Sequence, residues 1–205
     1  MNKIHIFLLV RTMIISHRGN GNHNFKENSK EAIIFSLNDK NVDGIEIDIR
    51  FTKDKKMVLC HNATYDGKII KYTNFNDLPF EDIYTIFKKV KTKKLILLEI
   101  KDNDIENITY ILNFIKTFSH LNIYVQSFYK EILLKIKEKN KSLKIGLICF
   151  HIPENINNYD FISIWFQNYT YINKEIFVWT VNSKKQIKRF ISLDINIITD
   201  KSYII

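Results

Sequence analysis

Short apolar runs that alternate with helix-like stretches constrain the fold of this chain more than any other sequence feature. The runs that read as strands lie at residues 13–16, 44–51, 57–61, 94–101, 122–128, 144–150, 161–166, 176–182 and 196–200. Amphipathic stretches separate most of them, and two parallel strands need such a long crossover between them. The alternation therefore predicts an α/β fold with a parallel sheet covered by helices.

The number of runs favours a closed barrel. A (β/α)₈ barrel uses eight parallel strands, one fewer than the runs found here, and we expect residues 161–166 to lie outside it because their connections are short and irregular. The chain has 205 residues, fewer than the roughly 250 typical of such barrels, and only "KSYII" follows Asp200. The prediction is a compact (β/α)₈ TIM barrel, trimmed at the last helix.

One helix carries its own boundary signals. Residues 76–90, "NDLPFEDIYTIFKKV", have the pattern of a helix in which Asn76 or Asp77 is the N-cap. Pro79 then falls in the first turn, where a proline is well tolerated. We expect one continuous helix over this range.

The composition indicates one globular domain over residues 13–205, because 45% of the residues are hydrophobic and 26% charged. Residues 1–12 form an N-terminal extension of uncertain status. Their apolar run is interrupted by Arg11 and no small-residue cleavage site follows, so we do not interpret it as a signal peptide. Translation starts at Met1 or at Met13. No apolar run reaches the roughly 20 residues of a membrane span, and we expect a cytoplasmic protein.

The charge of the chain favours anionic partners of small size. The formal net charge is +9 and the sequence pI is about 9.3, but the lysines are scattered and form no basic stripe interleaved with aromatic residues. This argues against nucleic acid and leaves a phosphate-bearing small molecule, with at most weak contact with an anionic lipid surface and no stable membrane insertion. Cys60 and Cys149 form no CxxC pair and are expected to be buried thiols. The oligomeric state is left open.

Three acidic residues at strand ends predict a metal site. In "GIEIDIRF" (44–51) the side chains alternate between the two faces, so Glu46 and Asp48 share one face. Glu99 ends the strand at 94–101, and the carboxyl ends of barrel strands meet on one side of the molecule. Three carboxylates are the hard oxygen donors that Mg²⁺ or Ca²⁺ prefers. The alternative is an ion network in which they pair with nearby arginines and lysines (Arg18, Arg50 and Lys101).

Other polar strand-end residues complete a catalytic set. His17 follows the first strand and His61 the third, and imidazoles that titrate near neutral pH can act as general base and general acid. Arg18 and Lys101 supply positive charge for a phosphate. A divalent cation, two acid–base groups and two cationic side chains together indicate phosphodiester cleavage.

The same residues lie in motifs that resemble a known family. The sequence is similar to the glycerophosphodiester phosphodiesterases in "HRG" (17–19), "ENSKEAI" (27–33), "GIEIDIRFTKD" (44–54), "MVLCHNATYDG" (57–67), "LLEIK" (97–101), "QSF" (126–128), "VWTVN" (178–182) and "IITD" (197–200). The motifs occur in the family order over nearly the whole chain. The resemblance implies a TIM barrel that hydrolyses glycerophosphodiesters to sn-glycerol 3-phosphate and an alcohol with one divalent metal ion, Mg²⁺ or Ca²⁺.

By motif match, the resemblance also assigns roles. It implies His17 and His61 as the catalytic pair, Arg18 and Lys101 as phosphate ligands, and the metal ligands Glu46, Asp48 and Glu99. Glu27 matches a position near the active face, and Trp179 matches an aromatic residue that lines the substrate pocket. Two positions depart from the family pattern, because Lys26 stands where a proline is usual and Asn62 where an aspartate is usual.

The sequence is compatible with two other functions. A phospholipase-D-like relative would cleave lysophospholipid or sphingomyelin at the same kind of site, and the aromatic-rich residues 161–171, "FISIWFQNYTY", would then supply an apolar rim. A catalytically idle barrel would serve as a binding protein. Measurable turnover separates the idle barrel from both enzymes.

Overall fold

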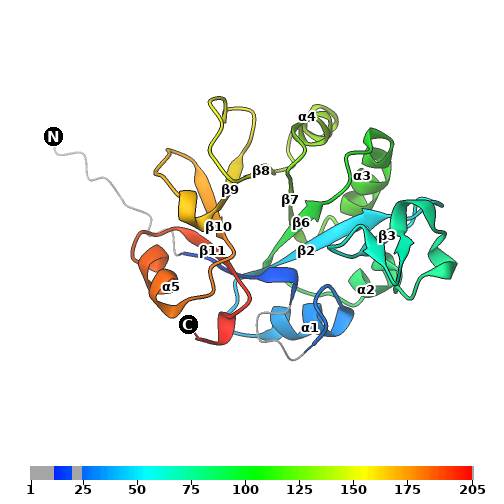
Figure 1. The fold of residues 1–205 in the computed structure, drawn as a ribbon, viewed down its shortest axis with the longest axis horizontal. Helices are drawn as coiled ribbons and strands as arrows, with labels where there is room; N and C mark the ends of the chain where they lie inside the picture. Colours follow the sequence, from blue (N-terminus) through cyan, green and yellow to red (C-terminus); the bar gives the residue numbers. More distant parts are fainter. Residues whose placement is uncertain (1–11, 20–24, 205) are drawn as a thin grey trace.

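The computed structural model describes residues 12–19 and 25–204, and these form a closed barrel. Its sheet has nine strands in the order β1-β11-β10-β9-β8-β7-β6-β2-β3, and β1 also pairs in parallel with β2, which closes the ring. The parallel strands are β1 (Ile14–Ser16), β2 (Gly44–Phe51), β6 (Leu95–Ile100), β7 (Asn122–Ser127), β8 (Ile145–Cys149), β9 (Phe161–Trp165), β10 (Glu175–Trp179) and β11 (Asn196–Thr199). The predicted (β/α)₈ barrel is thereby confirmed (Figure 1).

The strand outside the parallel barrel is not the expected one. Residues 161–166 were predicted to lie outside, yet β9 pairs in parallel with both β8 and β10. The additional strand is β3 (Met57–Leu59), which runs antiparallel to β2. The physical reason is the connection: residues 52–56 form a turn in which Lys55 has φ 62. So short a link permits a hairpin but no parallel crossover.

The helices surround the ring of strands (Figure 1). They are α1 (Lys30–Asn38), α2 (Ile83–Phe87), α3 (Ile108–Thr117), α4 (Lys130–Lys139) and α5 (Lys184–Ile191). The connection from β8 to β9 has no helix in the described chain, and that from β9 to β10 has only the 3₁₀ turn η5 (Phe166–Asn168). After β11 the described residues contain only the 3₁₀ turn η6 (Ser202–Ile204).

The helix predicted at 76–90 was too long. The 3₁₀ turn η3 (Phe75–Asp77) comes first, and α2 begins after Asp82, whose side chain accepts a hydrogen bond from the Thr85 backbone N–H. Leu78 is extended, with φ −124 and ψ 146. The residue before a proline is disfavoured in helical conformation, so Pro79 separates the turn from the helix.

A small subdomain lies beside β2 between β3 and α2 (teal in Figure 1). It consists of the two-stranded pair β4 (Thr64–Tyr65) and β5 (Lys68–Ile69), followed by the 3₁₀ turn η2 (Ile70–Tyr72) and η3. Two further 3₁₀ turns, η1 (His17–Gly19) and η4 (Ile105–Asn107), follow β1 and precede α3. The subdomain packs through its own apolar cluster, which includes Val58, Ile70 and Leu78.

Strand alternation divides the side chains between two environments. Outward residues such as Ile47 and Leu98 join the large core under the helices. Inward residues form a smaller cluster of Ile15, Leu95, Leu97, Phe161, Phe177 and Ile198. On β6 the inward positions 95 and 97 are leucines and the next, position 99, is Glu99. The barrel interior is therefore apolar below and becomes polar at the carboxyl ends of the strands.

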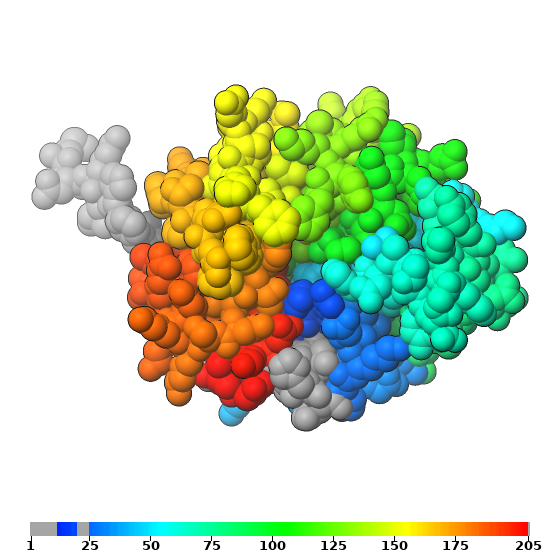
Figure 2. All heavy atoms as spheres, in the orientation of Figure 1, coloured from blue at the N-terminus to red at the C-terminus, as the bar shows by residue number. Residues whose placement is uncertain are grey.

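Most of the predicted N-terminal extension lies outside the part of the chain that the structure describes. Residues 1–11 of the predicted extension lie outside the described residues, whereas Thr12 is buried beside β1. Among the described helices, none combines the length and apolar character needed to cross a bilayer. Cys60 and Cys149 are free and half-buried, so the expectation of buried thiols is met only in part. On the face shown in Figure 2, the red C-terminal segment lies against the dark blue first segment.

Candidate functional site

Three buried carboxylates meet at the carboxyl ends of two neighbouring strands. Glu46 and Asp48 come from β2 and Glu99 from β6, and Asp48 stands directly beside Glu99 in the parallel register. One oxygen from each of the three lies within 4.8 Å of the others. Glu46 and Asp48 are only 2% and 1% exposed. Like charges at this distance repel strongly without a compensating cation.

The pKa shifts in this acid triad show that its negative charges are only partly neutralised by the surrounding protein. Burial, and then the charges of Asp48 and Glu99, raise the pKa of Glu46 well above its ordinary value. Burial and Asp48 likewise raise the pKa of Glu99 to about 7, although Lys101 opposes the shift. Among the described residues, the buried Oε1 of Glu46 has no hydrogen-bond donor. A buried acceptor without a donor is costly.

Two cationic side chains neutralise part of the triad. Lys101 Nζ lies 2.6 Å from Glu99 Oε1 and 3.5 Å from Asp48 Oδ1. Arg18 Nε lies 3.5 Å from Asp48 Oδ2, and the Arg18 backbone N–H donates to Glu46 Oε2 at 3.1 Å. The alternative ion network is therefore present for Asp48 and Glu99, whereas Glu46 receives one backbone N–H and no close cation in the described chain.

Glu27 positions Arg18 and does not line the central cavity. Its two carboxylate oxygens accept hydrogen bonds from Arg18 Nη1 at 2.8 and 2.9 Å. Arg18 itself sits in η1 with φ 52, a left-handed conformation that is uncommon for a non-glycine residue. Its carbonyl accepts from the Asn28 backbone N–H, and the Asn28 amide then donates to Asp48 at 2.8 Å. The loop before α1 thereby fixes both a cation and a triad carboxylate.

His17 is oriented by a residue from the far end of the chain. Its Nδ1 lies 2.6 Å from Asp200 Oδ1, and Asp200 Oδ2 accepts from the Asn182 amide at 2.6 Å. A carboxylate only accepts, so Nδ1 carries the proton and Nε2 faces Glu46 Oε2 at 3.8 Å. Asp200 and Asn182 had no predicted role. Their positions after the carboxyl ends of β11 and β10 are the sequence signal that could have identified them as site residues.

His61 reaches the site from a different element than expected. It follows the antiparallel strand β3, so it does not end a third parallel barrel strand. The Arg50 guanidinium donates to the His61 carbonyl from Nε at 3.1 Å and from Nη2 at 2.8 Å. Asp102 holds the same guanidinium at 2.6 Å. Arg50 thus serves as a backbone clamp and does not join the acid triad.

The imidazole of His61 is half-buried beside Asn62. Its Nδ1 lies 3.1 Å from Asn62 Oδ1, so the residue that departs from the family pattern still contacts the ring. Burial lowers the pKa of His61 below its ordinary value, and the Asn62 contact acts in the opposite direction. The neutral form can accept a proton near pH 7.

These groups line one cavity of about 240 Å³ at the top of the barrel. His17, His61, Arg18 and Lys101 line it together with Glu46 and Glu99. The rest of the lining is mostly apolar and consists of Phe128, Ile148, Phe150, Trp179 and Ile198 with the polar Gln126 and Thr180. The Trp179 indole N–H donates to the Ser163 carbonyl at 3.0 Å, which fixes its ring in the wall. The structure thus places every predicted site residue except Asp48 and Glu27 in the lining of this cavity. Asp48 and Glu27 lie directly behind the lining, where both contact the Arg18 guanidinium.

The donor set fits a hard divalent cation. Carboxylate oxygens are the ligands that Mg²⁺ and Ca²⁺ prefer. A cation at this point would supply the partner that Glu46 Oε1 lacks and would offset the repulsion that raises the pKa of Glu99.

The sequence is similar to known proteins. A model of the "Glycerophosphoryl diester phosphodiesterase family" matches residues 17–86. A glycerophosphodiester phosphodiesterase of Caldanaerobacter subterraneus subsp. tengcongensis is 25% identical over 232 residues, which cover 93% of this chain and 95% of that protein. An uncharacterised protein of Mycoplasma genitalium is 31% identical over 110 residues, 52% of this chain and 41% of that protein.

Solved structures share the fold over nearly the whole chain. A glycerophosphodiester phosphodiesterase of Parabacteroides distasonis has a TM-score of 0.84 at 15% identity, with 94% of both chains covered. A phosphodiesterase of Oleispira antarctica, solved in complex with the product sn-glycerol-3-phosphate, has a TM-score of 0.83 at 14% identity, with 95% of both chains covered. The solved structures show that the chain shares their fold, and the family model and the relative from Caldanaerobacter show that its sequence is similar to glycerophosphodiester phosphodiesterases.

Proposed function

We propose that the protein hydrolyses glycerophosphodiesters to sn-glycerol 3-phosphate and an alcohol. One observation carries the proposal beyond the similarity to these proteins: two imidazoles from different elements, His17 after β1 and His61 after β3, line the same cavity as Glu46 and Glu99 of the acid triad. The relative from Caldanaerobacter carries the name of this activity, and the structure from Oleispira is that of a complex with the corresponding product.

Arg18 and Lys101 would bind the phosphate. Both line the cavity, and the buried Nε of Arg18 makes no hydrogen bond within the described chain. Glu27 holds the Nη1 end of the guanidinium, so a phosphate oxygen would meet a fork that is already oriented. Lys101 is held by Glu99 and acts as a point charge.

The acid triad would hold the divalent metal ion. Glu46, Asp48 and Glu99 are its ligands in this proposal, and the set suits both Mg²⁺ and Ca²⁺. When bound, the cation neutralises charge on the phosphate oxygens.

The histidines would move the protons. Asp200 keeps the proton of His17 on Nδ1, so that Nε2 is the atom that exchanges a proton at the cavity. One imidazole would deprotonate the nucleophile and the other would protonate the departing alcohol oxygen. The nucleophile is either water or the neighbouring hydroxyl of the substrate, which would give a cyclic phosphate first.

Phosphorus NMR tests this function directly. Protein is incubated with glycerophosphocholine in the presence of Mg²⁺, Ca²⁺ or a chelator. We expect a metal-dependent sn-glycerol 3-phosphate signal that His17→Ala lowers by about 10²- to 10⁴-fold. His120→Ala serves as control, because His120 is exposed and lies outside the cavity. Conversion that survives in His17→Ala or in chelator would contradict the mechanism, and no conversion under any metal would favour the idle barrel.

Cleavage of lysophospholipid is a second candidate, favoured by an aromatic rim at the cavity mouth. Phe150 is 52% exposed and Phe128 39% exposed, and both pack on Trp179 with ring centroids 5.4 and 5.9 Å apart. The rim was expected within residues 161–171. Phe161 is buried inside the barrel, whereas Trp165 packs on Phe150 with ring centroids 6.0 Å apart. Lysophosphatidylcholine in the same NMR assay tests this activity. A Phe150→Ser variant that cleaves it as well as the wild type would argue against the rim.

A further inference from the structure

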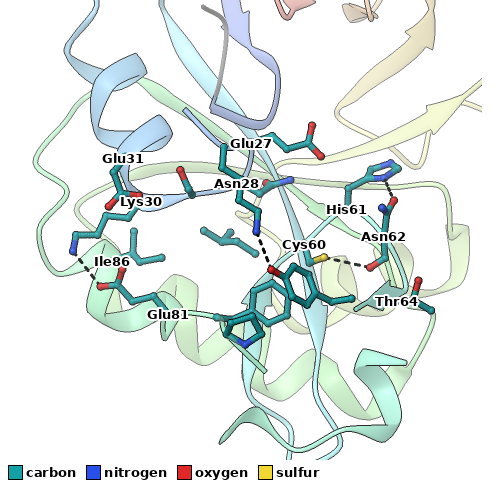
Figure 3. A pocket seen from close by; sticks show the side chains of 16 residues that line it. Glu27, Asn28, Lys30, Glu31, Cys60, His61, Asn62, Thr64, Glu81 and Ile86 are labelled. Carbon is teal, nitrogen blue, oxygen red and sulfur yellow. Dashed lines mark hydrogen bonds and ion pairs between the residues drawn. The ribbon is translucent and has the colours of Figure 1, made fainter. Parts of the chain in front are cut away.

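A second hollow lies directly beside the catalytic cavity and has no role in the proposal above. This side groove of about 340 Å³ is lined by Lys26, Glu27, Asn28, Ser29, Lys30, Glu31, Leu59, Cys60, His61, Asn62, Thr64, Tyr65, Pro79, Phe80, Glu81 and Ile86. One wall is the start of α1 and the other is the subdomain between β3 and α2. Figure 3 shows Glu27 and His61 at one end of it and Lys30 and Glu81 at the other.

The side groove and the catalytic cavity share a wall. His61 lines both hollows, and Glu27 lines the groove while its carboxylate holds Arg18 in the cavity. A phosphate placed between Arg18 and His61 therefore has the aromatic-walled cavity on one side and the groove on the other. A phosphodiester carries two organic groups, and these two hollows can take one each.

Most charges of the side groove are already paired. Glu27 is bound to Arg18, and Lys30 Nζ lies 3.3 Å from Glu81 Oε1. Lys26 differs, because its Nζ has no carboxylate within 4.0 Å in the described chain. It lies 4.8 Å from the centroid of the Tyr65 ring and 3.4 Å from the Tyr65 hydroxyl.

The ring under Lys26 is fixed in place. Tyr65 packs edge-to-face on Phe80, with ring centroids 5.1 Å apart. A quaternary ammonium group could bind this face of the Tyr65 ring only by displacing the Lys26 ammonium, and the two positive charges would then lie close together. An anionic group would instead gain an unpaired cation. Glu31, the other charged groove residue that makes no ion pair within the described residues, lies with Lys30 and Glu81 at the end away from His61 (Figure 3).

We propose that the side groove binds the alcohol half of the diester, and that Lys26 favours alcohols that carry an anionic group over those that carry a quaternary ammonium. This inference rests on the proposed hydrolysis of glycerophosphodiesters. It places His61 at the boundary between the two hollows. As the nucleophile bonds to phosphorus, the bond between phosphorus and the alcohol oxygen breaks there, and this oxygen takes a proton from protonated His61 and leaves into the groove.

The test compares three substrates that release the same product. Glycerophosphoinositol 4-phosphate carries an extra anionic group, glycerophosphoinositol lacks it, and glycerophosphocholine carries a quaternary ammonium; kcat/KM is measured from sn-glycerol 3-phosphate released. We expect Lys26→Gln to lower the preference for the 4-phosphate over each of the other two by about three- to fivefold, mainly through KM. Lys26→Glu should lower it further. Lys116→Gln, which removes an exposed lysine outside the groove, should leave it unchanged.

The outcomes separate this inference from the function on which it rests. Turnover of the three substrates with ratios that are equal in wild type, Lys26→Gln and Lys26→Glu would overturn the role of Lys26 and the groove while leaving the hydrolysis intact. No turnover of any substrate by the wild type would overturn the hydrolysis itself. Inhibition by sn-glycerol 3-phosphate should be equal in wild type and Lys26→Gln, and a weaker inhibition in the variant would place Lys26 at the phosphate instead.

Discussion

His17 shows how one side chain at this site depends on another for its orientation. The 2.6 Å contact with Asp200 fixes which ring nitrogen carries the proton, and Asn182 in turn holds Asp200. A histidine at a strand end without such a partner would rotate and would exchange its proton from either nitrogen. Asp200 is therefore a positioning residue for the proposed reaction.

Replacing the partner carboxylate should damage turnover more than binding. Asp200→Asn keeps the size of the side chain, but its amide group can turn an N–H toward the ring and favour the wrong tautomer. We expect kcat to fall by about 100-fold with little change in KM. The kcat against pH profile should also shift, which a purely structural defect would not cause. Asp194→Asn, at an exposed position, is the control; an Asp200→Asn enzyme with wild-type kcat and pH profile would refute the role.

The predictable residues were those whose chemistry is visible in one strand. Glu46, Asp48 and Glu99 stand out because carboxylates interrupt apolar runs at inward positions. Asp200 does not stand out in this way, because its role arises from a contact with His17 across the seam of the barrel, 183 residues away in sequence. No local pattern encodes such a pairing.

At the scale of elements, the assignment of β3 and β9 differs from the prediction: β9 belongs to the parallel barrel and β3 does not. Both are short apolar runs of similar character, and neither composition nor periodicity distinguishes them. The length of the preceding connection does, since only a short turn separates β3 from β2 whereas β9 follows β8 after a longer loop. The number of apolar runs was sufficient to predict a barrel. The lengths of the connecting segments were needed to decide which of the runs are its parallel strands.

The contact between β8 and β9 offers a test of barrel packing. A Cβ atom added at Gly146 would lie 2.0 Å from the Phe161 ring, which fills the lower barrel. Gly146→Ala should therefore reduce the free energy of unfolding by about 1–3 kcal/mol, measured by urea denaturation. The double variant with Phe161→Leu should be less destabilised than the sum of the two single variants. Strict additivity would show that the two residues do not compete for this space.

For the whole molecule, the acid triad makes stability depend on pH and on cations. Folding raises the pKa of both Glu46 and Glu99, so their contribution to stability is fully present below about pH 4.5 and is lost as pH rises, for Glu99 through about 7. Without divalent cations, the free energy of unfolding should fall between pH 5 and 8 by on the order of 2 kcal/mol. His61, whose pKa is lowered, opposes this with a smaller gain up to its unfolded value near 6.5.

Denaturation in chelator and in Mg²⁺ measures this effect. Glu46→Gln, which removes one buried charge, should show a shallower fall with pH than the wild type. At pH 8, Mg²⁺ should raise the free energy of unfolding of the wild type and should raise that of the variant less. A wild-type protein in chelator whose free energy of unfolding falls no more steeply between pH 5 and 8 than that of Glu46→Gln would contradict the proposed electrostatics.

The hydrogen-bonded seam between β1 and β11 also determines when the parts of the site can come together during synthesis of the chain. The acid triad, His61 and Lys101 all emerge from the ribosome in the first half of the chain, whereas the neighbour of β1 and the partner of His17 come with the last strand. A nascent chain can therefore assemble its acidic cluster long before its proton-transfer machinery. Phosphodiester cleavage would begin only when the final strand docks, so an unfinished chain would be catalytically silent.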